Sequence, residues 1–366
     1  MTGPGGVEAW ASARNVLAVR LDTLGDVLMT TPALRALKEG HPNRRLTLLT
    51  SPPGAAVAHL VPEIDEVLVY EAPWLKATAP RASSAPDLEM IGRLRERHFD
   101  AAAIFTVYSQ SPLPSAMLCF LVDIPLRLAH CRENPYQLLT DWVRETEPEG
   151  GIRHEVQRQL DLVGAVGART ADERLSLSFP PEAAERVDER LARLRLNRSR
   201  SWAVVHPGAT ASSRRYPPEY FAEVARLLTD QGLTLLFTGS GGERELIEDI
   251  RHMAGGVGHS LAGQLDLAEL AALLSRAPLL ISNNTGPTHM AAALGTPVVD
   301  LYALTNPQHT PWQVPSRVLS HDVPCRWCYR SVCPEGHHLC LRGVRPEEVV
   351  AAAQGLLSPL PLEFVP

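Results

Sequence analysis

The sequence predicts an α/β protein made of two domains, and three observations lead to that fold class. Short runs rich in valine, leucine and alanine alternate with longer helical patterns along most of the chain. The alternation stops at a charged helical stretch that ends near residue 197, and it starts again at residue 202. The chain also has 366 residues, more than the roughly 250–300 at which a single hydrophobic core stops growing.

The first domain is expected to span residues 1–197. Its strands are predicted at 15–21, 46–50, 66–70 and 101–106, with helices at 26–39 and 180–197. Strands separated by helices are joined by right-handed crossovers, which makes the sheet mainly parallel. Residues 72–86 are rich in proline and small side chains and predict a surface loop.

The second domain is expected to span residues 198–343, beginning at the short polar stretch 198–201. Its strands are predicted at 202–206, 233–238, 279–282 and 298–302, with helices at 218–231, 243–253, 266–276 and 285–294. A final part, 344–366, contains the helix-forming run 346–357. The sequence therefore contains two α/β units followed by one helix.

Composition excludes several classes of function. Apolar residues make up 45% of the chain and charged residues 21%, and 35 basic against 41 acidic residues give a net charge of −6. This balance provides no overall basic field for nucleic acid. The first fifteen residues lack an apolar core, and no run approaches the ~18–20 apolar residues of a membrane span. We therefore expect a cytoplasmic protein.

The first motif, R-L-D-T-L-G-D-V at residues 20–27, joins a predicted strand to its helix. Gly25 permits close backbone approach, and Asp22 and Asp26 lie at the strand's carboxyl end, where open α/β sheets bind ligands. Asp26 also stands where a helix cap belongs, so a purely structural capping role is the alternative. The motif lacks G-x-G-x-x-G, and no G-x-x-x-x-G-K-[ST] phosphate loop occurs in the chain.

A second motif follows the strand at 202–206. Gly208 and the small residues after it expose backbone N–H groups, and Arg214 and Arg215 add two guanidinium groups. These are the groups that bind phosphate, so the segment predicts an anion site. The alternative is a tight turn with solvated arginines.

Two further glycine turns follow buried strands. In S-N-N-T-G-P-T-H, Thr285 and Gly286 offer donors at the positive end of a helix, which favours a pyrophosphate, and His289 lies one turn further on. In T-G-S-G-G-E, Glu243 is suited to accept hydrogen bonds from ribose hydroxyls or to cap the next helix.

In this order and spacing, these segments resemble the glycosyltransferase family 9 enzymes, the heptosyltransferases of lipopolysaccharide core assembly. The resemblance runs from about residue 16 to 353 and rests on L-G-D-V with T-P-A-L, H-P-G-A with R-R-Y-P-P, S-N-N-T-G-P-T-H-M-A-A-A-L-G-T-P, and a C-terminal cysteine segment. It implies a GT-B architecture, two Rossmann-like domains facing across a cleft. The acceptor would bind the N-terminal domain and the nucleotide-sugar the C-terminal one, and the helix in 344–366 would cross back to the first domain.

The resemblance also implies roles for individual residues. Asp26 matches the family's catalytic base, within the acceptor-side loop that holds Asp22 and Gly25. Arg214 stands where a lysine commonly contacts the donor phosphates, and Glu243 matches an acidic residue near the donor's ribose. The remaining donor-binding positions would be Gly208, Arg215, Asn284, Thr285, Gly286 and His289. Asn284 departs from the family, because many members have aspartate there.

The implied activity is transfer of a sugar, heptose from ADP-heptose, to a hydroxyl of a lipopolysaccharide-core or related glycan acceptor. Asp26 would take the acceptor's proton, and the arginines and a helix N-terminus would stabilise the leaving nucleoside diphosphate. No D-x-D pair lies in a suitable loop, so we expect no catalytic metal or cofactor. We also expect no nucleic-acid partner and at most peripheral contact with the inner membrane face. The alternatives are a sugar-nucleotide 2-epimerase and a non-catalytic nucleotide-sugar binder.

The cysteine segment places four of the six cysteines within residues 325–340. Cys325, Cys328, Cys333 and Cys340 could hold zinc or an iron–sulfur cluster, and packed free thiols are the alternative. In either case we expect the segment to stabilise the second domain without affecting the reaction.

Overall fold

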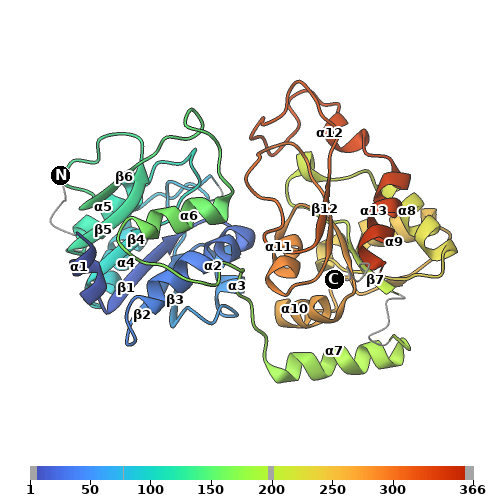
Figure 1. Cartoon of the computed structure of the whole chain (residues 1–366), viewed down its shortest axis with the longest axis horizontal. Helices are drawn as coiled ribbons and strands as arrows, with labels where there is room; N and C mark the ends of the chain where they lie inside the picture. The colour runs from blue at the N-terminus through green and yellow to red at the C-terminus, as the bar shows by residue number, and fades with distance from the viewer. Residues whose placement is uncertain (1–5, 77, 197–201, 359–366) are drawn as a thin grey trace, which may run out of the picture. The chain divides into compact units, whose positions relative to one another are not determined.

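The structure is a computed structural model that describes residues 6–76, 78–196 and 202–358. It divides into two compact units, Met1–Ser176 and Leu177–Pro366. Each unit contains a six-stranded sheet in which all paired strands run parallel (Figure 1). The predicted α/β class is confirmed.

The first unit has the strand order β3-β2-β1-β4-β5-β6. The strands are β1 Asn15–Arg20, β2 Arg45–Thr50, β3 Glu66–Val69, β4 Ala101–Ile104, β5 Leu126–Cys131 and β6 Asp141–Arg144. The helices are α1 Gly6–Ser12, α2 Leu24–Glu39, α3 Pro52–Ala58, α4 Ala85–Arg95, α5 Leu113–Leu121 and α6 Glu155–Gly164. Every residue of β1 after Asn15 is buried, as expected for a central strand covered on both faces.

The second unit has the strand order β12-β11-β10-β7-β8-β9. The strands are β7 Trp202–His206, β8 Thr234–Phe237, β9 His259–Ser260, β10 Leu280–Asn283, β11 Val298–Leu301 and β12 Ser316–Leu319. The helices are α7 Pro181–Arg193, α8 Pro218–Asp230, α9 Arg244–Met253, α10 Leu267–Arg276, α11 Gly286–Ala293, α12 Leu339–Arg342 and α13 Pro346–Leu357, with 3-10 turns η1 Ser212–Arg214 and η2 Gly241–Glu243.

Four strands were not predicted from the sequence: β5, β6, β9 and β12. Three of these, β6, β9 and β12, form sheet edges, are at most four residues long and include polar residues. The apolar run that indicates a buried strand is therefore missing there.

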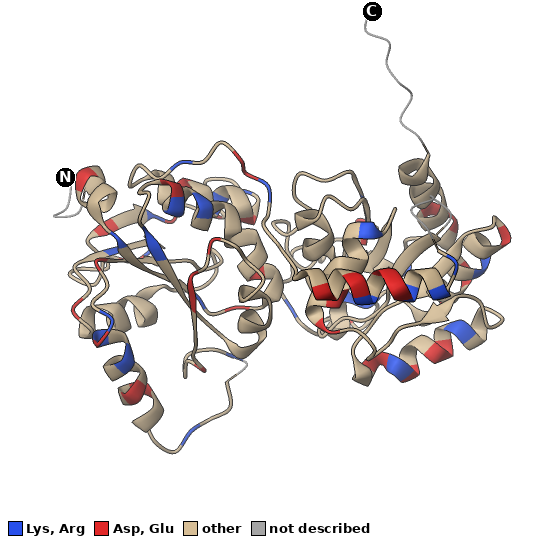
Figure 2. Cartoon of the chain, turned by 90° about the horizontal axis from the view of Figure 1, so that it is seen from below, with Lys and Arg blue, Asp and Glu red and all other residues tan. Residues whose placement is uncertain are grey.

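The boundary between the units differs from the prediction. The units divide at 176/177 rather than at 197, so the charged helix α7 belongs to the second unit. Its apolar stripe of Ala183, Val187 and Leu191 is buried, and the helix packs against α10. Seen from below, acidic and basic residues follow one another along the rest of α7 (Figure 2). The expected linker 198–201 lies outside the described residues.

The last helix also differs from the prediction. α13 packs against α8, β11 and β12 within the second unit, where the sequence led us to expect a helix that crosses back to the first domain. Val349, Val350 and Ala353 are buried in the same core as Phe221. Burial of this apolar face gives the helix its place in the second unit. Residues 359–366 lie outside the described residues.

Candidate active site

The loop between β1 and α2 gathers three carboxylates around one buried arginine. Arg20, the last residue of β1, is fully buried. Its Nε lies 3.1 Å from Asp22 Oδ2, and its Nη2 lies 3.2 Å from Asp26 Oδ1. Its Nη1 donates to Glu155 Oε1, from the first turn of α6, at 2.9 Å. One positive charge therefore faces three acidic groups.

Asp26 lies in the first turn of α2 and also caps that helix. Its Oδ2 accepts hydrogen bonds from the backbone N–H of Thr23 at 3.0 Å and from Thr23 Oγ1 at 2.7 Å. The capping role that the sequence left open is therefore present in the structure. Capping holds the carboxylate at the carboxyl end of β1 and so does not compete with a role in proton transfer. Gly25, beside it, is buried.

Asp22 is an acidic group of this loop whose protonation is shifted by its surroundings. Burial raises the pKa of Asp22 to about 6, against the opposing charge of Arg20. Its Oδ1 accepts a hydrogen bond from Gln110 Nε2 at 2.8 Å. Asp22 and Asp26 are bridged by the same guanidinium, so the loop holds two carboxyl groups of which one can carry a proton near neutral pH.

In the second unit, the turns after β7 and β8 meet at Gly208 and Glu243. A Cβ atom at Gly208 would lie 1.9 Å from Glu243 Oε1, so only glycine allows this approach. Glu243 Oε2 accepts hydrogen bonds from the backbone N–H of Ser240 at 2.7 Å and from its Oγ at 2.9 Å. Glu243 thus organises its own turn, and its other oxygen faces the Gly208 turn.

Asn283, at the end of β10, holds both ends of the loop between β7 and α8. Its Oδ1 accepts a hydrogen bond from the backbone N–H of Tyr216 at 3.0 Å, and its Nδ2 donates to the carbonyl of Pro207 at 2.7 Å. The hydroxyls of Thr285 and Thr288 donate to the Asn283 carbonyl. We did not single out Asn283 from the sequence, although an amide that ends an apolar strand is a recognisable signal.

The side-chain amide of Asn284 donates a hydrogen bond to a buried acid, Asp300, on the neighbouring strand. Its Nδ2 donates to Asp300 Oδ2 at 3.0 Å and to the carbonyl of His309 at 2.8 Å. Burial raises the pKa of Asp300 to about 8, despite the Asn284 hydrogen bond and the positive charge of Arg214. A carboxyl group therefore lies beside the position where many family members have aspartate. Asp300 is not among the site residues expected from the sequence, although an acid inside the apolar strand β11 is a visible signal.

The remaining donor-site positions predicted from the sequence lie in the same unit. Thr285 precedes α11, Gly286 begins it, and His289 is buried within it. Arg214 ends η1 and is close enough to Asp300 for its charge to lower that pKa, while Arg215 Nε donates to the carbonyl of Ala209 at 2.8 Å. These segments follow β7, β8 and β10, and β7 pairs with both β8 and β10. The predicted donor residues are thus brought to the carboxyl edge of one sheet.

The cysteine segment contacts the arginine loop, which we did not expect. The backbone N–H of Ser213 donates to the carbonyl of Ser331 at 3.1 Å, and Ser213 Oγ donates to the carbonyl of Arg330 at 2.7 Å. Ser213 immediately precedes Arg214, so the cysteine segment helps to place a predicted phosphate ligand. The expectation that this segment does not affect the reaction stays a prediction, and the contact at Ser213 is the place to test it.

The cysteines themselves surround one small cavity of about 20 Å3. It is lined by side chains that include Cys325, Cys328, Cys333, Cys340, His337 and His338. All six cysteines are free thiols, and Cys325 Sγ lies 3.8 Å from His337 Nε2. Among the described residues, no three His, Cys, Asp or Glu side chains are arranged to hold a metal ion.

The two α/β units, each built on a six-stranded parallel sheet, have the fold of the GT-B glycosyltransferases, to which the solved structures compared below belong. The model of glycosyltransferase family 9 (heptosyltransferase) matches residues 88–339, and the chain belongs to this family. The family resemblance noted in the sequence is confirmed, and so is the expectation that the protein is an enzyme.

Individual relatives are distant in sequence. The lipopolysaccharide core heptosyltransferase OpsX of Haemophilus influenzae is 22% identical, with 81% of each chain covered. The solved ADP-heptose lipopolysaccharide heptosyltransferase II of Escherichia coli has a TM-score of 0.71 at 22% identity, over 94% of this chain and 98% of that one. A family 9 glycosyltransferase from Veillonella parvula has a TM-score of 0.77 at 22% identity, over 94% and 97%.

Proposed function

We propose that this glycosyltransferase moves a heptose from ADP-heptose to a hydroxyl group of a lipopolysaccharide-core or related glycan. Membership of the heptosyltransferase family supports the sugar, and the solved Escherichia coli relative is named for ADP-heptose. The observation that carries the proposal is the gathering of Gly208, Glu243, Asn284 and Arg214 at one sheet edge of the second unit.

The donor site would bind the nucleotide and stabilise its departure. Glu243 would accept hydrogen bonds from the ribose hydroxyls, and Arg214 and Arg215 would pair with the phosphates. As the bond between the anomeric carbon and the phosphate oxygen breaks, negative charge grows on the nucleoside diphosphate. Arginine charges and the N-terminus of α11 at Thr285 and Gly286 oppose that charge without requiring a metal ion.

The acceptor's proton would go to Asp26. The attacking hydroxyl oxygen forms a bond to the anomeric carbon, and its proton passes to a carboxylate oxygen of Asp26. The contacts of Asp26 with Arg20 and Thr23 fix the orientation of its side chain, so positioning contributes more than basicity. Asp22, which contacts the guanidinium group of Arg20 as well, would be a second carboxyl group in this loop that can accept a proton.

Three expectations accompany this function. Among the described residues no helix is long and apolar enough to cross a membrane. As a separate expectation, we propose a cytoplasmic enzyme with peripheral contact at the inner membrane face. We also retain the cysteine segment as a structural metal site for zinc or iron–sulfur, because four thiols and two imidazoles surround one cavity. A structural relative from Escherichia coli, TibC, is described as an iron-containing glycosyltransferase.

An Asp26→Asn variant tests the assignment. We expect turnover to be lost while ADP affinity, measured by calorimetry, changes by no more than a few-fold. Asp100→Asn is the matched control, since Asp100 accepts backbone N–H groups at the opposite end of β1. A wild-type rate in Asp26→Asn would reduce Asp26 to a helix cap.

The same assay separates the other classes of function. Release of ADP that depends on an acceptor supports transfer. An epimerised nucleotide-sugar formed without acceptor would indicate a 2-epimerase, and binding without any product would indicate a nucleotide-sugar binder.

A further inference from the structure

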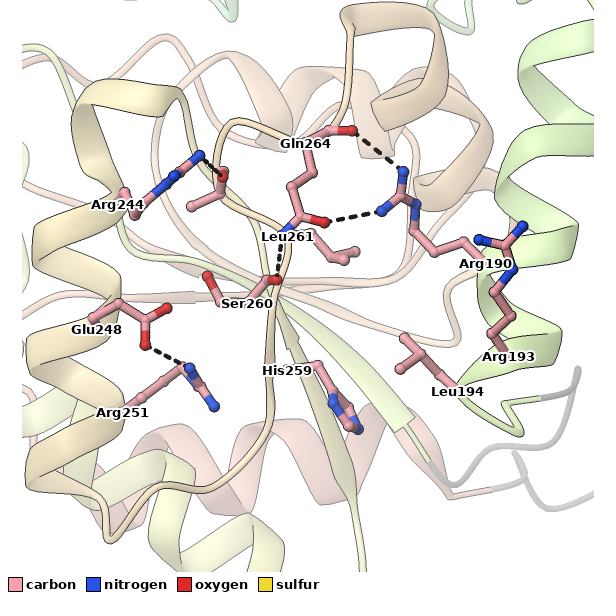
Figure 3. A pocket seen from close by; sticks show the side chains of 11 residues that line it. Arg190, Arg193, Leu194, Arg244, Glu248, Arg251, His259, Ser260, Leu261 and Gln264 are labelled. Atoms are coloured by element: carbon pink, nitrogen blue, oxygen red, sulfur yellow. Dashed lines mark hydrogen bonds and ion pairs between the residues drawn. The ribbon is translucent and has the colours of Figure 1, made fainter.

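A second cavity in the second unit lies outside the candidate donor site. It has a volume of about 710 Å3 and is bordered by α7, α9 and the edge strand β9. Figure 3 shows Arg190 and Arg193 on the α7 side and Arg244 and Arg251 on the α9 side, with His259 between them. None of the donor-site residues named above lines it.

The lining of this cavity, which we call the arginine groove, is strongly basic. Its ionisable side chains are four arginines, one histidine and a single acid, Glu248, although the whole chain carries a net charge of −6. Such an excess of one charge in a hollow surface concentrates ligands of the opposite charge.

Among the described residues, two of the four arginines have hydrogen bonds only to neutral oxygens. Arg190 donates to the side-chain and backbone oxygens of Gln264 at 3.0 and 3.4 Å, and Arg244 donates to the carbonyl of Ala262 at 3.3 Å. Arg251, in contrast, pairs with Glu248, and Arg193 pairs with Glu189 outside the groove. An anion that binds Arg190 and Arg244 therefore need not break an ion pair.

We propose that the arginine groove binds a phosphate ester. Guanidinium groups on two facing helices match the several oxygens of a phosphate better than the two of a carboxylate. The volume lies within the ~300–1,000 Å3 typical of small-molecule sites, so there is room for a group attached to the phosphate. Leu194 and Leu261 provide apolar contact for that group. A sugar phosphate and the headgroup of an anionic lipid both have this chemistry.

The test uses the full chain and two probes, with ADP present to occupy the donor site. Calorimetry measures binding of glucose 6-phosphate, and cosedimentation measures binding to phosphatidylglycerol vesicles, with phosphatidylcholine vesicles as the neutral comparison. The double variant Arg190→Gln/Arg244→Gln removes the two available charges. Arg226→Gln is the matched control, because Arg226 lies on α8 and pairs with Glu223 and Asp230.

We expect the double variant to weaken binding at least about tenfold, because each arginine makes charge-assisted hydrogen bonds. Its ADP affinity should be unchanged, which separates this site from the proposed donor site. Loss of glucose 6-phosphate binding assigns the groove to a soluble phosphate ester, and loss of binding to phosphatidylglycerol vesicles alone assigns it to a lipid headgroup. If neither probe binds, or if the double variant binds as tightly as Arg226→Gln, the proposal is wrong.

Discussion

Replacing Asp300 by asparagine tests whether a buried, largely protonated carboxyl group sits beside Asn284. Burial raises the pKa of Asp300 from its ordinary value of 3.8 to about 8. Between these two values the folded chain holds a proton that the unfolded chain has released. Stability is therefore lost as pH rises through this window, and the loss is complete above about pH 8.

The size of the effect follows from the width of the window. Each pH unit above the ordinary pKa lowers the free energy of unfolding by about 1.4 kcal/mol, so at pH 7 the buried Asp300 carboxyl group destabilises the folded chain by on the order of 4 kcal/mol. Asparagine does not titrate, so the substitution removes this destabilisation. Its amide N–H groups need an acceptor, however, and leaving them buried without one costs about 1–3 kcal/mol. We therefore expect Asp300→Asn to stabilise the protein by roughly 1–3 kcal/mol at pH 7.

The diagnostic quantity is the slope with pH rather than the value at one pH. Urea unfolding of wild type and Asp300→Asn is compared between about pH 5 and pH 8, and the advantage of the variant should grow by about 1.4 kcal/mol per unit. Asp249→Asn, on the exposed side of α9, controls for removing a charge without burial. A stability difference that is the same across this range would refute the reasoning.

A swap of the two side chains extends this test. Asn284→Asp alone loses the donor to Asp300 and to the carbonyl of His309, at about 1 kcal/mol for each hydrogen bond. In the double variant Asn284→Asp/Asp300→Asn, the amide at 300 can donate to the carboxylate at 284. We expect the double variant to be more stable than the sum of the two single effects by at least about 1 kcal/mol, a coupling that two independent sites would not show.

The remaining predictions concern the donor loop and the cysteine segment. Arg214→Ala should weaken ADP binding by roughly 1.5–3 kcal/mol in calorimetry, the range for hydrogen bonds to charged groups, and unchanged affinity would place the phosphates elsewhere. Ser213→Ala removes the hydroxyl that donates to the Arg330 carbonyl, so the KM for the donor should rise several-fold with little change in kcat, whereas a lower melting temperature with normal KM would mean a purely structural contact. Cys325→Ser should lower the melting temperature if the thiols hold metal, with about one equivalent of zinc or an iron–sulfur absorption band in untreated protein. Absence of metal after anaerobic purification, with unchanged melting, would leave packed thiols.

The sequence by itself determined the α/β class and the places where chemistry would occur. Continuous apolar runs indicate strands covered on both faces, and a glycine or acidic residue directly after such a run lies at a sheet's carboxyl edge whatever the strand order. For this reason Asp26, Gly208 and Glu243 could be selected from their local pattern. The edge strand β9 was not predicted, because it has only two residues and forms through its pairing with β8.

Only the tertiary structure decided which of those residues meet. Asn284 and Asp300 are separated by α11 in the chain, and they come together because β10 and β11 are adjacent in the sheet. Ser213 and the segment near Arg330 lie more than a hundred residues apart and meet through backbone carbonyls, which carry no sequence signal. Likewise, α7 and α13 belong to the second unit because their apolar residues are buried there. Local pattern specifies the chemistry of a side chain, whereas packing selects its partners.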